Sequence, residues 1–283
     1  MVIVRQWGGL GNQMFIDAFV SSLINKGKTV KIDISYYDYF DGTYDLKRIF
    51  GIEHEIASKS ECHNWAIYEL DFFHRIIRKY VPKVIKKQTQ IMENNRNYGY
   101  NYDDFFSIDN CYIEGYFQSE KYFMEIKHKI IKAFSFPSID DNNKNILMKI
   151  RNSNSVSIHI RRGDYLKQRS VFKTCDVSYY QKAISYIKSN SISPYFFVFS
   201  NDIEWCKKNI EEKNICYVDN NNGINSFRDM QLMSECKHNI IANSTFSWWG
   251  AWLNKNKDKI VCAPSSWFVG MHDNPVPEDW IRI

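Results

Sequence analysis

The sequence predicts an α/β fold made of two Rossmann-like domains that face a central cleft. From residue 155 onward, apolar strand-like runs alternate with helical segments four or five times, which is typical of a parallel sheet with helices on both faces. The first half shows a weaker version of the same alternation. The chain has 283 residues, of which 44% are hydrophobic, which is enough for two packed cores.

The first elements form a strand, a glycine-rich turn, a helix and a second strand. Val2–Val4 is a short apolar run, and glycines follow it at positions 8, 9 and 11. Residues 14–23 form an apolar stretch of helical length, and residues 29–34 alternate as a strand. Residues 72–92 read as a basic amphipathic helix.

The second half continues this pattern after a polar run at residues 140–145 (DDNNKN), which we expect to be a linker. It divides the chain into predicted domains 1–145 and 146–283. We expect strands at 156–160, 195–200, 216–218, 239–242 and 259–263, and helices at 177–188, 203–212, 227–236 and 247–253.

The charge and cysteine content exclude several classes of protein. The formal net charge is +5, which is less basic than a dedicated nucleic-acid binder, so no nucleic-acid partner is expected. The seven cysteines are scattered without a CxxC pair, which argues against a disulfide framework and a zinc site and fits a reducing cytosol.

The chain shows no signal-like N-terminus and no apolar window of membrane-spanning length, so a cytoplasmic protein is expected. The basic segment 72–91 fits a solvated surface helix. It also fits peripheral contact with the inner face of a membrane.

The motif at residues 159–164 (HIRRGD) directly follows the apolar strand 156–160. Ligands of parallel sheets bind at the carboxyl ends of strands, and the guanidinium groups of Arg161 and Arg162 match the oxygens of a diphosphate. Asp164 could orient an arginine or act as a base. A purely structural arginine–aspartate pair fits the same motif.

Two more strand ends carry polar groups. Ser244 and Thr245 lie where a helix begins after strand 239–242, so they could offer hydroxyl and N–H groups to an anion or simply cap the helix. Asp202 follows strand 195–200, where its carboxylate could accept hydrogen bonds from a guanine edge or cap the next helix.

The first glycine turn has two interpretations. Gly9 and Gly11, with Asp33 further on, are similar to a dinucleotide fingerprint and allow an NAD-type oxidoreductase. Met14 occupies the third glycine position of that fingerprint, where the helix must approach the strand closely. A glycine-lined edge of an acceptor cleft, with Asn12 pointing inward, explains the residues as well.

No Asp-x-Asp pair and no cluster with metal-ligand spacing occurs in the chain. We therefore expect no metal and no other cofactor. In the absence of a metal ion, the Arg161–Arg162 pair is the natural group to neutralise a diphosphate.

Taken together, these motifs resemble glycosyltransferase family 11, the α-1,2-fucosyltransferases, here of bacterial type. The resemblance spans nearly the whole chain in the expected order. It rests on GGLGNQMF (8–15), GYFQSEKYF (115–123), HIRRGD (159–164), FSND (199–202) and NSTFSWWGAWL (243–253).

The resemblance implies a GT-B fold with an acceptor-side domain 1–145 and a GDP-fucose-binding domain 146–283. In that fold the final segment can pack back on the N-terminal domain. It also implies an inverting, metal-independent transfer of L-fucose from GDP-β-L-fucose to the 2-hydroxyl of a terminal galactoside, in surface-glycan or O-antigen synthesis. The acceptor would be a galactose-terminated oligosaccharide, free or lipid-linked.

The resemblance also assigns residues. Arg161 and Arg162 match arginines near the β-phosphate, and His159 and Asp202 match groups near guanosine. Asn12 faces the acceptor. The remaining matches are Ser244, Thr245 and Phe246 in the phosphate-side loop. Gly9 and Gly11 are candidate substrate-binding residues through the acceptor-edge interpretation given above.

One departure from the family pattern is Ile16-Asp17, which stands where Gln-Tyr is usual. The general base is open between Asp164, the first candidate, and Glu114 or Asp17. A fucosyltransferase of another linkage and a non-catalytic nucleotide- or sugar-binding module remain alternative functions.

Overall fold

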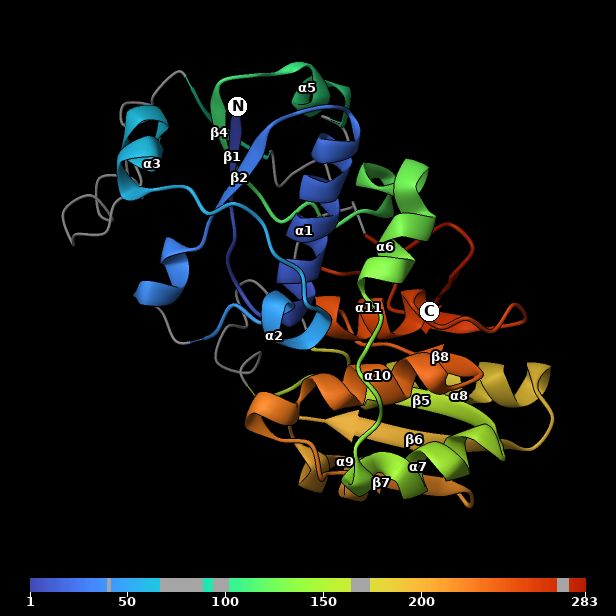
Figure 1. Ribbon diagram of the computed structural model, residues 1–283. Helices are drawn as coiled ribbons and strands as arrows, with labels where there is room; N and C mark the ends of the chain where they lie inside the picture. The colour runs from blue at the N-terminus through green and yellow to red at the C-terminus, as the bar shows by residue number, and fades with distance from the viewer. Residues whose placement is uncertain (40–41, 67–88, 94–101, 164–173, 269–274) are drawn as a thin grey trace. The chain divides into compact units, whose positions relative to one another are not determined.

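The computed structural model describes residues 1–283 except 40–41, 67–88, 94–101, 164–173 and 269–274. It divides into two compact units, Met1–Ser135 and Phe136–Ile283. Each unit contains its own parallel sheet (Figure 1). The predicted α/β class with two Rossmann-like domains, as in the GT-B type, is confirmed.

The N-terminal unit has a four-stranded sheet with the order β2-β1-β4-β3, in which every pairing is parallel. Its strands are β1 (Val2–Arg5), β2 (Val30–Asp33), β3 (Gln90–Met92) and β4 (Cys111–Glu114). Its helices are α1 (Leu10–Asn25), α2 (Leu46–Phe50), α3 (Lys59–Trp65), α5 (Tyr102–Ser107) and α6 (Lys127–Ala133), with short 3-10 turns at Ser35–Asp38, Glu120–Tyr122 and Met124–Ile126.

The helix α1 is the central packing element of this unit. Its side chains Met14, Phe15 and Phe19 are fully buried, and the ring of Phe19 stacks on Phe117 with 3.9 Å between ring centroids. The turn that leads into α1 needs a glycine at position 8, because its φ of 76° is one that other residues rarely adopt. The predicted strand–turn–helix–strand unit is therefore present.

The C-terminal unit has a six-stranded, wholly parallel sheet with the order β10-β9-β8-β5-β6-β7. Its strands are β5 (Asn154–Ile160), β6 (Pro194–Ser200), β7 (Ile215–Val218), β8 (His238–Ile240), β9 (Val261–Ala263) and β10 (Ile281–Arg282). Its helices are α7 (Asp141–Arg151), α8 (Val177–Asn190), α9 (Ile203–Asn209), α10 (Phe227–Glu235) and α11 (Thr245–Trp252), with a 3-10 turn at Gly223–Asn225.

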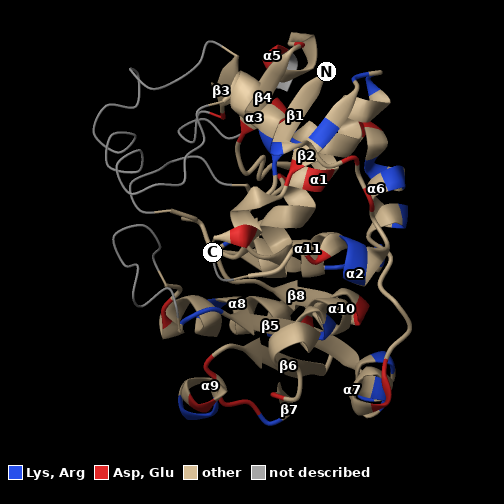
Figure 2. Cartoon of the chain, turned by 60° about the vertical axis from the view of Figure 1, so that its left-hand side comes forward, with Lys and Arg blue, Asp and Glu red and all other residues tan. Residues whose placement is uncertain are grey.

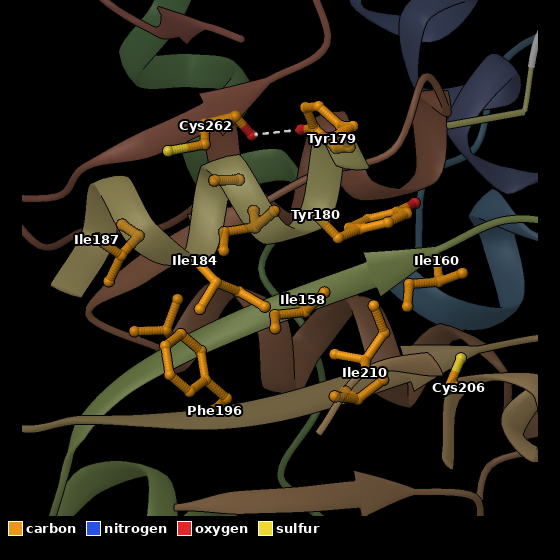
Figure 3. Packing of buried hydrophobic residues seen from close by; sticks show 14 residues of the cluster. Ile158, Ile160, Tyr179, Tyr180, Ile184, Ile187, Phe196, Cys206, Ile210 and Cys262 are labelled. Atoms are coloured by element: carbon orange, nitrogen blue, oxygen red, sulfur yellow. Dashed lines mark hydrogen bonds between the residues drawn. The ribbon is translucent and has the colours of Figure 1, made fainter. Parts of the chain in front are cut away.

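Strands β5 to β9 carry no charged residue, and charges gather on helices such as α7 and α9 (Figure 2). That distribution fits a sheet covered on both faces. On one face, Ile158 and Ile160 of β5 pack against Tyr180 of α8 (Figure 3). The Tyr179 hydroxyl donates to the carbonyls of Ile241, at 2.6 Å, and Cys262, at 3.2 Å, and so ties α8 to the β8 and β9 segments.

Two predictions of secondary structure are wrong: the linker at residues 140–145 and the end of the basic helix at residues 72–92. The expected linker at residues 140–145 is the start of α7, because Asp140 caps the helix by accepting from the Asn143 amide at 3.0 Å. The predicted domain boundary at 145/146 therefore falls inside α7, whereas the two units divide at 135/136. The end of the expected basic helix is strand β3, and residues 72–88 of that segment lie outside the described residues.

The end of the chain belongs to the C-terminal sheet, where β10 pairs with β9 at one edge. In the part of the chain that the structure describes, no helix is both long and apolar enough to span a bilayer.

A ladder of buried amides joins α7, the β7–α10 loop and α10. Asn143 exchanges two hydrogen bonds with Asn221, at 2.8 and 2.9 Å. Asn221 also donates to the Asp229 carboxylate at 2.8 Å. Burial raises the pKa of Asp229 to about 7, although the Asn221 hydrogen bond opposes the shift.

This carboxyl makes stability depend on pH near neutrality. The folded protein holds the Asp229 proton up to a pKa of about 7, whereas the unfolded chain releases it near 3.8. The contribution is therefore complete below about pH 4 and is lost as the pH rises toward 7. We expect Asp229→Asn to remove that loss, so that the melting temperature of the variant rises relative to wild type between pH 5 and pH 8. The difference in the free energy of unfolding should grow by up to about 1.4 kcal/mol per pH unit. An Asp279→Asn control at an exposed site should show no such trend, and parallel curves for Asp229→Asn and wild type would contradict the assignment.

Candidate functional site

The C-terminal sheet reverses its strand order at β5. The chain runs from β5 to β6 and β7 on one side, then returns to β8 and β9 on the other. In open parallel sheets, ligands bind at the carboxyl ends of the two strands that flank such a reversal. Here those ends are the β5 end, followed by residues 161–163, and the β8 end, followed by residues 243–247. Two of the sequence motifs therefore meet at one edge of one sheet.

His159 and Phe246 join the two motifs. Their ring centroids lie 5.7 Å apart, with 35° between the ring planes. His159 is 4% exposed, and its Nδ1 atom has no hydrogen-bond partner among the described residues. Burial, aided by the charge of Arg161, lowers the pKa of His159 to about 3. The imidazole is thus neutral at physiological pH and adds no positive charge beside the arginines.

Arg162 is held by the loop after β6. Its guanidinium carbon lies 4.0 Å from the ring centroid of Trp205, and its Nε atom lies 3.6 Å from the Asp202 carboxylate. Its backbone N–H donates to the Asn201 side-chain oxygen at 3.0 Å. Gly163 follows in a tight space, since a Cβ there would meet the Asn201 amide nitrogen at 2.9 Å.

Asp202 is the N-cap of α9. This confirms the capping role, which was one of the two roles that the sequence allowed. Asp202 accepts from the backbone N–H of Trp205 at 3.3 Å, and its own N–H donates to the Ser200 hydroxyl at 2.9 Å. Its carboxylate also faces Arg162, and its side chain is 33% exposed. The guanine contact stays a prediction.

The loop before α11 is fixed from within. The Asn243 amide donates to the carbonyl of Trp267 at 3.0 Å, and the Ser247 hydroxyl donates to the Ala242 carbonyl at 3.3 Å. Ser244 occupies the N-cap position of α11 without a side-chain cap. Thr245 and Phe246 are half-buried in the first turn. Trp248 and Trp249 of the same motif are fully buried in the core.

In the N-terminal unit, the glycine turn is bound to the loop after β4. Asn12 accepts from the Gln118 side chain at 3.0 Å, and the Trp7 indole N–H donates to the Gly115 carbonyl at 3.0 Å. The rings of Trp7 and Tyr116 stack, with centroids 4.9 Å apart. The motifs at 8–15 and 115–123 are therefore neighbours within this unit.

Glu93, at the end of β3, anchors that second loop. Its carboxylate accepts from the backbone N–H groups of Tyr116 and Phe117, both at 2.8 Å, and from the Tyr122 hydroxyl at 3.0 Å. Burial raises its pKa despite these hydrogen bonds. Gly115 allows this approach, because a Cβ there would lie 2.6 Å from the Glu93 Cβ.

Some residues of the glycine turn are exposed, and others are buried and hold the structure together. Gly9 is exposed with open space around it, whereas Gly11 is buried. The Gln13 side chain donates to the carbonyls of Gly8 and Thr43 and accepts from the Asp45 N–H, so it holds two loops together.

The alternative acids of the N-terminal unit are unsuited to their proposed roles. Glu114 is 1% exposed and pairs with Arg5 at 3.0 Å, and Asp17 is 1% exposed and lies 2.6 Å from the His54 Nε2 atom. Neither carboxylate is placed to take a proton from a bound substrate. Asp164, the first candidate base, lies outside the described residues.

The dinucleotide interpretation also fails on geometry. Asp33 is 3% exposed, and its two carboxylate oxygens accept from the Ser35 N–H at 2.8 Å and the Tyr112 hydroxyl at 2.6 Å. Met14 is fully buried in the third glycine position. The acid that would bind a ribose is therefore occupied inside the protein.

Sequence reasoning missed the contributions of Trp205, Asn201 and Gln118. The signal for Trp205 is its position three residues after Asp202 on a helix, which returns its side chain toward the capping residue. Within the described part of the chain, no group of three His, Cys, Asp or Glu side chains could hold a metal ion.

Comparison with known proteins agrees with these motifs. The chain is 35% identical to an α-1,2-colitosyltransferase of Escherichia coli, covering 100% of this chain and 99% of that one. It is 32% identical to the O-antigen biosynthesis glycosyltransferase WbnK of Escherichia coli, covering 98% of both chains. A segment covering 35% of this chain is 33% identical to 28% of human galactoside α-(1,2)-fucosyltransferase 1.

The family model described as "Glycosyl transferase family 11" matches residues 2–270. That match covers the glycine turn, the arginine motif and the serine–tryptophan motif together. The chain therefore belongs to glycosyl transferase family 11.

Proposed function

We propose that this enzyme transfers L-fucose from GDP-β-L-fucose to the 2-hydroxyl of a terminal galactoside, with inversion and without a metal ion, in surface-glycan or O-antigen synthesis. The observation that carries the proposal is the pair Arg161 and Arg162 at the carboxyl end of β5, where the sheet reverses its strand order. The names of the full-length bacterial relatives and of the human galactoside enzyme support the linkage and the pathway.

The proposed reaction is a single displacement. The acceptor hydroxyl oxygen forms a bond to the anomeric carbon, the bond from that carbon to the β-phosphate oxygen breaks, and GDP leaves with the electron pair. Negative charge grows on the β-phosphate as this bond breaks. The two guanidinium groups and the first N–H groups of α11, near Ser244 and Thr245, would stabilise that charge.

The other residues have supporting roles in this proposal. The neutral His159 and the Asp202 carboxylate lie on the guanosine side, and Phe246 packs against His159. On the acceptor side, Asn12 and the open turn at Gly9 present an amide and backbone groups to sugar hydroxyls. Asp164 takes the acceptor proton.

A second donor follows from one comparison. The relative that matches this chain over its whole length at 35% identity is named an α-1,2-colitosyltransferase. Colitose is fucose without its 3-hydroxyl group, so GDP-colitose offers the same nucleotide and the same anomeric chemistry. GDP-colitose is therefore the second candidate donor.

Nucleotide selectivity tests the donor site. We expect GDP to raise the melting temperature, with UDP, ADP and NAD giving little or no shift, because only GDP offers a guanine edge to the β6 end. At 100 times its Kd, GDP should stabilise the protein by about 2.7 kcal/mol. The shift should be the same in EDTA. A shift that requires Mg²⁺, or no shift with GDP, would refute the metal-free arginine site.

The transferred sugar and its linkage are read from the product. With galactose-terminated acceptors, GDP-fucose or GDP-colitose should yield an α-1,2-linked product in NMR spectra. A higher kcat/KM for one donor identifies the natural sugar. A product linked elsewhere on galactose, or hydrolysis of both donors without transfer, would contradict the proposal.

Removal of one arginine tests the charge argument. We expect Arg162→Ala to lower kcat by about 10² to 10³, the typical loss for one transition-state donor, with an unchanged melting temperature. Arg151→Ala is the matched control, because Arg151 is 61% exposed and pairs with Glu235 at the surface of α7. Retention of full activity by Arg162→Ala would show that this guanidinium does not stabilise the departing phosphate.

A further inference from the structure

The loop that follows β6 holds Arg162 at three points. Asn201 accepts from its backbone N–H, Asp202 faces its Nε atom, and the Trp205 ring lies under its guanidinium carbon, 4.0 Å from the ring centroid. All three residues come from one short stretch at the beginning of α9. Arg162 therefore follows β5, but its orientation is set by the segment that connects β6 to α9.

The contact with Trp205 does not use the N–H groups of Arg162. A guanidinium group stacked on an indole keeps all its N–H groups in its own plane, where they can still bind anion oxygens. The Nε atom makes no hydrogen bond among the described residues, and its distance of 3.6 Å from the Asp202 carboxylate is too long for one. The side chain is 18% exposed, so it is largely desolvated and still reachable.

The carboxylate and the ring act differently on this side chain. Asp202 is fixed by its own role as the cap of α9, where it accepts from the Trp205 backbone N–H. Without the indole, the flexible arginine could swing into a two-hydrogen-bond pair with this carboxylate, the geometry that arginine and carboxylate prefer. That pairing would occupy the two N–H donors that would otherwise bind a diphosphate.

We propose that Trp205 is a positioning residue that holds the guanidinium plane of Arg162 ready for the diphosphate of a nucleoside diphosphate ligand. The inference rests on the proposed function, which places that diphosphate at the β5 end. The physical gain is preorganisation: the side chain is ordered before the ligand binds, so binding does not have to order it.

Trp205 also packs partly against the core of the C-terminal unit. A purely structural role would therefore change stability without involving Arg162. A double-mutant cycle separates the two roles, because it reports whether the effect of one side chain depends on the other.

The experiment measures GDP affinity by calorimetry on the full chain. It compares wild type, Trp205→Leu, Trp205→Phe, Arg162→Ala and the Trp205→Leu/Arg162→Ala double variant. We expect Trp205→Leu to weaken GDP binding about 3- to 30-fold, the range of a partly desolvated cation–π contact. Trp205→Phe should recover most of the affinity, since a benzene ring can still stack. In the Arg162→Ala background, Trp205→Leu should change the affinity less than about twofold.

A matched control is Trp65→Leu. Trp65 is half-buried in the N-terminal unit and packs there against a separate cluster, so its loss should leave GDP affinity unchanged. Melting temperatures of all variants should lie close together if the change in affinity comes from positioning.

An equal loss of affinity from Trp205→Leu with and without Arg162 would overturn the inference, as would no loss in either background. If Trp205→Leu does not fold, Trp205→Phe in the two backgrounds decides: any weakening that persists without Arg162 overturns the inference. Failure of wild type to bind GDP at all refutes the proposed function. GDP binding combined with an additive cycle refutes only the role of Trp205.

Discussion

The position of β5 in the C-terminal sheet is the constraint on which the site depends. Because β5 pairs with both β6 and β8, the connections that follow these three strands emerge at one edge. The arginines, the cap of α9 and the first turn of α11 lie up to 84 positions apart in the sequence (161 to 245), yet strand pairing fixes their proximity. The face of β5 opposite to His159 supports this arrangement, since Ile158 and Ile160 are fully buried against α8.

In the N-terminal unit, unlike at the β5 end, several charged groups are buried and serve the structure. Its carboxylates Asp17, Asp33, Glu93 and Glu114 are all buried, and each is bound by a specific donor: a histidine, a tyrosine, two backbone amides and an arginine, respectively. Leaving any of these charges without its partner would be costly, because a buried unpaired charge is strongly destabilising. They join segments of this unit that are distant in sequence. Apparent catalytic acids in a sequence can thus be structural.

Sequence reasoning succeeded where the pattern is local and repeated. Strand β5 alternates apolar and polar residues, strand β6 is a continuous apolar run, and α8 and α10 have clear helical length, so their positions were predicted closely. It failed where a tertiary contact overrides composition. The polar run at 140–145 looks like a linker, but Asp140 caps a helix there, and the side chain of Asn143 is fully buried through its amide contacts with Asn221. Likewise β4 was not predicted, because its four residues gain their strand pairing only between β1 and β3.

By itself, the sequence determined the family and the parallel α/β class and named candidate site residues, because motif order and strand–helix alternation are properties of the chain. Only the tertiary structure decided which of those residues are accessible and what orients them. Glu114 and Arg162 illustrate the difference. Glu114 ends strand β4 and is enclosed with Arg5. Arg162 follows strand β5, lies over the Trp205 ring and has an Nε atom without a hydrogen bond among the described residues. Burial and stacking depend on neighbours that are distant in sequence, and no local pattern records them.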